Sequence, residues 1–269
     1  NIPFPRYVLF ILFFPQLIAG PIVRSSEIVH QFEKKSVFIP NAKNLSIGIS
    51  IFIIGLFKKV VIADSMALFV NPVFSAASNG IELTIWEAWG GALAYTFQLY
   101  FDFSGYSDMA IGLARIIGIR IPINFFSPYK ATSIRDFWRR WHITLSRFLR
   151  DYLYIPLGGN RKGKSRQYKN LILTMALGGL WHGAAWTFIL WGFIHGVLLI
   201  VNNLWLNLKI KNWMYIRNNV MWQWSCRFLT FFAVVNSWVI FRSDNLNTAY
   251  AMYRAMFGVN GISLPDELK

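Results

Sequence analysis

Residues 170–208 are the longest part of this sequence without a charged side chain. These 39 residues contain no Asp, Glu, Lys or Arg. An α-helix needs about 20 apolar residues to cross the hydrocarbon core of a bilayer. The stretch therefore has room for two membrane spans, or for one span and a re-entrant segment, and it argues against a water-soluble domain.

The rest of the chain is also patterned like a membrane protein with many helices. Charged residues make up only 14% of the sequence, whereas a soluble domain typically has about 25%. Apolar or amphipathic patterning predicts further helices over 45–70, 86–118, 222–241 and 247–257. The sequence therefore predicts an all-α, polytopic membrane protein.

The formal net charge of +15 permits two interpretations. Nucleic-acid binding is one, but the long apolar runs argue against it. The other is membrane topology, because Lys and Arg are retained on the cytoplasmic side of a membrane protein. Ten of the 27 basic residues lie within 135–169, beside only two acidic residues. We expect 134–169 to be a cytoplasmic helix followed by a glycine-rich basic loop.

A second kind of pattern occupies residues 134–155. Apolar side chains recur there at alternating steps of four and three residues, from Ile134 to Ile155, which indicates one amphipathic helix. The opposite face carries Arg135, Arg139, His142, Ser146 and Arg150. A basic amphipathic helix with Trp residues is typical of the membrane interface, so we expect this helix to lie on the membrane instead of crossing it.

His182 is the first candidate for chemistry. It lies deep in the uncharged stretch and follows the small residues Gly178 and Gly179. An ionisable group in a membrane segment faces the bundle interior or a cavity, and imidazole can remove a proton from a hydroxyl near neutral pH. The alternative is a hydrogen-bonded structural histidine.

His142 is the second candidate. On the predicted helix it shares a face with Arg135, Arg139 and Ser146. Such a surface suits lipid phosphates, or a phosphate-bearing carrier such as coenzyme A or phosphopantetheine. The alternative is an interfacial histidine on a helix that faces lipid.

Asp102 and Asp108 lie inside a predicted apolar helix, where unpaired carboxylates are costly. We expect them to pair with a basic residue of the cytoplasmic helix or to orient a histidine. His195 is expected to be structural. The sequence has one cysteine, Cys226, no HExxH motif and no GxSxG motif, so neither a metal site nor a serine nucleophile is indicated.

Together these segments resemble the membrane-bound O-acyltransferase (MBOAT) family, and most of all its bacterial alginate O-acetyltransferase branch. The matching segments are 101–108 (FDFSGYSD), 124–125 (NF) with 128–129 (PY), 137–146 (FWRRWHITLS), 150–152 (RDY), 156–161 (PLGGNR) and 178–184 (GGLWHGA). The two tryptophan–histidine motifs are specific in combination.

The resemblance implies a ring of transmembrane helices around a funnel or tunnel in the inner membrane. It implies that His182 and His142 correspond to the family's two histidines, which we expect to be catalytic. We further expect Arg135, Arg139 and Ser146 to bind the donor, and Asp102, Asp108 and Asn124 to orient or support the site. The implied donor is acetyl-CoA, with no permanently bound cofactor. The implied acceptor is a polysaccharide such as alginate, reached through a periplasmic or extracellular acetyltransferase partner protein.

Two other functions stay open from the sequence. A sister branch of the family moves D-alanine from a carrier protein to teichoic acid, and a non-catalytic transporter of an acyl donor or polymer is a further alternative. Because members of the family are longer at both ends, we expect the chain to be one incomplete MBOAT domain that lacks its terminal parts.

Overall fold

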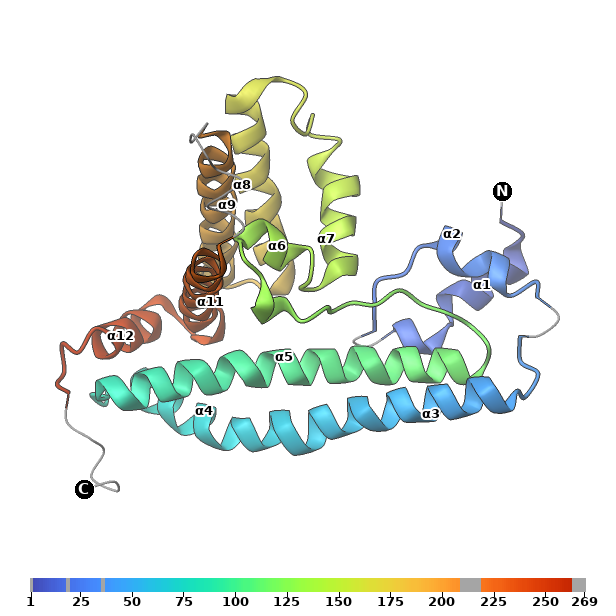
Figure 1. Cartoon of the computed structure of the whole chain (residues 1–269), viewed down its shortest axis with the longest axis horizontal. Coiled ribbons are helices and arrows are strands. Elements are labelled where there is room, and N and C mark those ends of the chain that lie inside the picture. The colour runs from blue at the N-terminus through green and yellow to red at the C-terminus, as the bar shows by residue number, and fades with distance from the viewer. Residues whose placement is uncertain (1, 18–19, 35–36, 209–218, 263–269) are drawn as a thin grey trace. The chain divides into compact units, whose positions relative to one another are not determined.

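The computed structural model describes residues 2–17, 20–34, 37–208 and 219–262 (Figure 1). Within these ranges the chain is helical and contains no β-strand, which confirms the predicted all-α class. The α-helices are α1 (Phe4–Ile11), α2 (Ser25–Ile28), α3 (Ala42–Phe57), α4 (Asp64–Ser78), α5 (Ile85–Ile116), α6 (Ile134–Trp138), α7 (Ile143–Leu149), α8 (Gly163–His182), α9 (Trp186–Asn207), α11 (Val220–Arg242) and α12 (Leu246–Met256).

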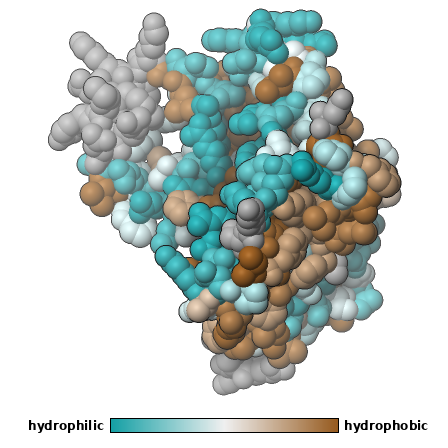
Figure 2. All heavy atoms as spheres, turned by 90° about the vertical axis from the view of Figure 1, so that its right-hand side faces the viewer, coloured by the Kyte–Doolittle hydropathy of each residue, from teal (hydrophilic) through white to brown (hydrophobic). Residues whose placement is uncertain are grey.

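Among the described residues, three helical stretches are long and apolar enough to cross a membrane. They are Ala42–Ser78, Trp186–Asn207 and Val220–Arg242. The first contains α3 and α4, joined without a break by the π-helix η3 (Lys58–Ala63). Large apolar side chains are exposed along α3, among them Ile49, Ile53 and Phe57. Figure 2 shows broad apolar areas on the face that it presents, as expected for a protein whose solvent is partly lipid.

The chain forms two compact units. The first unit contains residues 1–65, 98–126 and 140–148, and the second contains residues 66–97, 127–139 and 149–269. Helix α5 therefore contributes its beginning to the second unit and its end to the first. The sequence predicts a single domain whose helices form a ring around a funnel. Both predictions depend on how these two units are arranged, and both stay predictions.

A glycine seam joins α3 to the second half of α5 in the first unit. A Cβ atom added to Gly48 would lie 2.7 Å from the carbonyl oxygen of Gly112, and one added to Gly55 would lie 2.6 Å from that of Gly105. From the first contact to the second, residue numbers rise along α3 and fall along α5, so the two helices are antiparallel. Small residues at such positions let helix backbones approach closely in a membrane.

A second glycine seam joins α8 to α9 in the second unit. Added Cβ atoms at Gly179 and Gly192 would lie 2.1 and 2.2 Å from the carbonyl oxygens of Phe188 and Met175. Only 183–185 separate the two helices, so the uncharged stretch of the sequence folds back on itself as an antiparallel pair (Figure 1). The sequence had allowed this arrangement or a re-entrant segment.

The predicted continuous amphipathic helix over 134–155 is wrong. The segment contains the short helices α6 and α7 and the π-helix η5 (Arg150–Tyr154). Between α6 and α7, His142 has a φ of +41°, which no helical residue adopts. The two short helices each bury one residue of the predicted stripe, Ile134 in α6 and Leu145 in α7, whereas Phe148, Tyr152 and Ile155 are exposed.

Candidate active site

His182 is the last residue of α8. The glycine seam with α9 determines where this end of the helix lies, because Gly179 is one turn before His182 and touches the backbone of α9. Gly183 follows in an extended conformation and ends the helix. The small residues of the GGLWHGA motif therefore let α8 and α9 approach closely, and this packing positions the histidine.

The imidazole of His182 lies in a cage of aromatic rings. Its centroid is 5.5 Å from the Trp191 ring and 5.2 Å from the Phe241 ring, and both rings meet it edge to face. The neighbouring Trp181 ring is 5.0 Å away. Among the described residues, no side chain or backbone group forms a hydrogen bond with this half-buried imidazole. Its ring nitrogens are therefore available to a bound molecule.

His195 is different, because the protein uses both of its ring nitrogens. Nδ1 accepts a hydrogen bond from Nε1 of Trp138 at 3.2 Å, and Nε2 lies 3.0 Å from Oγ of Ser237. An indole N–H can only donate, so Nδ1 carries no proton and Nε2 of the neutral ring donates to Ser237. The Ser237 hydroxyl donates onward to the carbonyl of Val234 at 2.7 Å. This fully buried histidine has the geometry of a structural residue.

His142 lies in the first unit, and the prediction that it is on a cationic surface is wrong. The residue is 3% exposed. Its ring packs edge to face against Phe103, with the centroids 4.7 Å apart. The break in the helix turned this side chain inward, so it no longer shares a helical face with the arginines expected beside it.

Asn124 holds His142 in one tautomer. Its Oδ1 accepts from the backbone N–H of Thr144 at 3.3 Å and from the Thr144 hydroxyl at 2.9 Å. A backbone N–H is always a donor, which identifies this atom of Asn124 as the amide oxygen. Nδ1 of His142 lies 3.1 Å from the same oxygen and therefore carries its proton. In the neutral ring Nε2 is then the basic nitrogen.

Asp102 and Asp108 are paired, as charges inside an apolar helix must be, but with other partners than expected. Nζ of Lys59 lies 2.6 Å from a carboxylate oxygen of Asp102, and Nζ of Lys58 lies 2.5 Å from Asp108. Both lysines are on the π-helix η3 and not on the segment 134–155. Lys59 also contacts Asp64 at 2.6 Å. The role of these carboxylates stays a prediction.

The three residues expected to bind the donor lie in two different units. Arg135 and Arg139 are exposed in the second unit, and within the described part of the chain neither contacts an acidic side chain. Ser146 belongs to the first unit, where its hydroxyl donates to the carbonyl of Trp141 at 3.4 Å. The structure thus brings together Asn124, His142 and Ser107, whereas His182 belongs to the other unit.

Several residues that build the two histidine environments carried no signal in the sequence. Trp191 and Phe241 enclose His182 from α9 and α11, and Thr144 shares the oxygen that holds His142. Their positions follow from helix packing, which no local spacing reveals. No group of three or more His, Cys, Asp or Glu side chains that could hold a metal ion occurs among the described residues.

Comparison with known proteins places this geometry in context. The sequence model of MBOAT, the membrane-bound O-acyltransferase family, matches residues 1–243. The chain is 51% identical over 261 residues to the peptidoglycan O-acetyltransferase of Helicobacter pylori, and the match covers 97% of this chain and 48% of that protein.

Two further relatives differ from each other in the transferred group and in the acceptor for which they are named. The probable alginate O-acetylase AlgI of Pseudomonas syringae is 49% identical over 260 residues, or 97% of this chain and 47% of that protein. The teichoic acid D-alanyltransferase of Bacillus subtilis is 32% identical over 243 residues, or 87% of this chain and 58% of that protein. The chain spans about half the length of the curated relatives it matches.

Proposed function

The chain belongs to the membrane-bound O-acyltransferase family, and we propose that it forms the catalytic part of an O-acetyltransferase. The proposed reaction moves an acetyl group from a cytoplasmic thioester, acetyl-CoA, toward hydroxyl groups of a polysaccharide outside the inner membrane, such as alginate. The names of the relatives include both acetyl transfer and glycan acceptors, which supports this reaction.

This proposal rests on the hydrogen bonding of His182, compared with that of His195. Of the two buried or half-buried imidazoles in the second unit, His195 has both nitrogens bound by protein groups, and His182 has neither bound by a described residue. A histidine that is fixed by aromatic contacts but left without a hydrogen-bond partner is suited to general base catalysis.

The proposed chemistry transfers one proton and one acyl group. A nitrogen of His182 takes the proton of the acceptor hydroxyl while the hydroxyl oxygen attacks the carbonyl carbon of the thioester. The new C–O ester bond forms, the C–S bond breaks, and the thiolate leaves with the proton returned from the imidazole. This sequence needs no acyl-enzyme and no other reactant.

His142 is proposed as the second histidine of the reaction, and Asn124 as the residue that fixes its tautomer. Arg135 and Arg139 are proposed to hold the phosphates of the donor. Both are exposed, and neither contacts an acidic side chain within the described residues, which supports this role. That His142 and His182 open onto one passage is part of this proposal and depends on how the two units are arranged.

The decisive experiment compares two histidine variants of the full-length protein. We expect His182→Ala to lower acetyl transfer by a factor of about 10²–10⁴, the usual contribution of a general base, with unchanged protein abundance in the membrane. His195→Ala is the matched control, because it leaves the Trp138 N–H and the Ser237 hydroxyl without their partner. It should reduce the amount of folded protein, with activity lost in proportion.

Acetyl ester on the exported glycan is measured after mild alkaline release, beside D-alanyl ester as the alternative product. Wild-type transfer by the His182→Ala protein would overturn the proposed base. Release of D-alanine instead of acetate would assign the chain to the teichoic acid type of reaction. Flux of donor or polymer without ester formation would make the protein a transporter.

A further inference from the structure

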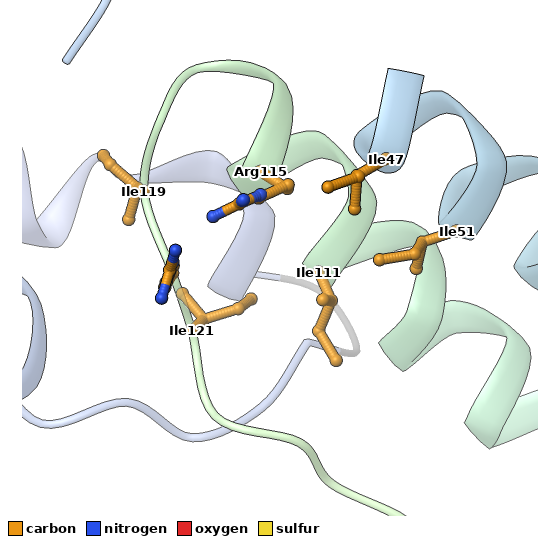
Figure 3. Close-up of a pocket in the computed structure, with 7 residues that line it drawn as sticks. Ile47, Ile51, Ile111, Arg115, Ile119 and Ile121 are labelled. Atoms are coloured by element: carbon orange, nitrogen blue, oxygen red, sulfur yellow. The ribbon is translucent and has the colours of Figure 1, made fainter. Parts of the chain in front are cut away.

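A pocket in the first unit lies between the beginning of α3 and the end of α5, and neither candidate histidine lines it. It has a volume of about 270 Å³ and a mainly apolar lining. Figure 3 shows Arg115 among isoleucines that come from α3, from α5 and from the segment after α5. The lining residues are Ile47, Ile51, Ile111, Arg115, Ile119, Arg120 and Ile121.

Neither arginine of this pocket has an acidic partner within the described residues. The first unit contains five acidic residues, and each of them is ion-paired with another base: Glu27 with Arg147, Glu33 with Arg6, Asp64 and Asp102 with Lys59, and Asp108 with Lys58. The Nε atom of Arg115 is shielded from solvent and has no hydrogen-bond acceptor among the described groups. The pocket therefore has two cations for which the unit supplies no anion.

The wall that carries the second arginine is held in place by protein contacts. The Gln31 side chain donates to the carbonyl of Arg120 at 2.8 Å and accepts from its backbone N–H at 2.9 Å. Ile119 and Ile121, on either side of Arg120, belong to the buried core of the unit together with Ile28. The site is thus formed before any ligand binds.

The position of the pocket corresponds to the edge of a membrane span. Ile47 lies about 8 Å from the start of the apolar stretch Ala42–Ser78, and Ile51 lies one turn deeper. Arg115 is in the last turn of α5. The pocket has cations at the helix ends and isoleucines deeper in the span. This order complements a lipid, whose charged headgroup lies at the membrane surface and whose acyl chain lies deeper.

We propose that this pocket binds one anionic glycerophospholipid. Its phosphate lies between the guanidinium groups of Arg115 and Arg120, which can both donate to phosphate oxygens. The first part of an acyl chain lies against Ile47, Ile51 and Ile111. A soluble phosphate compound would satisfy the arginines but not the apolar lining, which favours the lipid.

The test measures lipid binding to the full-length protein in detergent by native mass spectrometry. The probes are phosphatidylglycerol and phosphatidylcholine with the same acyl chains. We expect the wild-type protein to retain phosphatidylglycerol preferentially. The double substitution Arg115→Gln and Arg120→Gln should weaken its binding about tenfold or more, because charge-assisted contacts to phosphate are lost.

Three further variants keep the result interpretable. Lys164→Gln with Arg166→Gln removes the same charge from the exposed start of α8 and should leave binding unchanged. Arg120→Gln alone changes an exposed side chain and should weaken binding without affecting folding. Ile51→Phe fills the apolar part without changing charge and should also weaken it.

Equal losses from the Lys164→Gln and Arg166→Gln variant, or wild-type affinity in the Arg115→Gln and Arg120→Gln variant, would overturn the proposal. So would displacement of the lipid by coenzyme A or inorganic phosphate at these arginines, which would assign the pocket to a soluble phosphate compound.

Discussion

At the scale of single residues, the two candidate histidines are held in opposite ways. His182 is surrounded by ring faces and edges and has no protein hydrogen bond among the described residues. His142 is fixed by a hydrogen bond to an asparagine that also accepts from Thr144. Its positive φ is a strained conformation for a residue other than glycine, and such strain persists only where neighbouring contacts enforce it.

Asn124→Ala tests these contacts. The substitution leaves three buried donors, on His142 and Thr144, without their common acceptor. We expect the free energy of unfolding to fall by about 1–3 kcal/mol, seen as a lower midpoint of thermal unfolding in detergent. Acetyl transfer should fall as well, because the His142 ring loses its fixed tautomer.

Ser107→Ala is the matched control for Asn124→Ala. It removes only the acceptor of the Asn124 amide N–H, at 3.3 Å, and should have the smaller effect. Equal thermal stability of the Asn124→Ala and wild-type proteins would contradict the role given to the asparagine.

At the scale of helices, glycine seams join both antiparallel pairs. In α3 and α5 the close approach also brings the π-helix η3 within reach of α5, so that Lys58 and Lys59 meet Asp108 and Asp102. A π-helical turn widens a helix and often marks a site that function has shaped. The packing of small residues therefore makes room for the ion pairs in an otherwise apolar region.

Gly105→Ala tests the seam, with Gly90→Ala on the same helix as its control. The new Cβ at position 105 would lie 2.7 Å from the carbonyl oxygen of Gly55, whereas one at position 90 meets no atom within 4 Å. We expect Gly105→Ala to cost about 1–3 kcal/mol of stability and Gly90→Ala to be neutral or to add up to about 1 kcal/mol. Equal unfolding midpoints for the two variants would show that the helices do not touch at Gly105.

At the scale of the whole molecule, the distribution of charge predicts which side of the membrane each segment faces. The basic segment 135–169 is expected in the cytoplasm. Because α8 and α9 are antiparallel, the start of α8 and the end of α9 should lie on the same side of the membrane.

Cysteine labelling checks this topology. In a Cys226→Ser background, we expect Lys164→Cys and Asn207→Cys to react with a membrane-impermeant maleimide only after spheroplasts are permeabilised. The background protein without an added cysteine should not react. Labelling of Lys164→Cys on intact spheroplasts would reverse the orientation, and labelling of the two positions from opposite sides would contradict the antiparallel pair.

The sequence alone was sufficient to predict the helical class, the apolar stretches and the family. These follow from composition and from motifs that are local in the chain, because membrane insertion depends on the summed apolarity of about 20 neighbouring residues. The same local reasoning failed for 134–155, where a regular apolar period continued across a helix break. Two separate short helices bury Ile134 and Leu145 of this period, so a regular apolar period does not require one continuous helix.

The partner of each polar group depended on the three-dimensional fold. His142 meets Asn124 across 18 residues of sequence, His195 meets Ser237 across 42, and Lys58 meets Asp108 across 50. Hydrogen bonds and ion pairs require atoms within about 3 Å of each other, a condition that depends on helix packing and not on spacing along the chain. His195 has both ring nitrogens bound by protein groups, whereas His182 has neither bound by a described residue. This difference, on which the proposed function rests, therefore appears only in the folded protein.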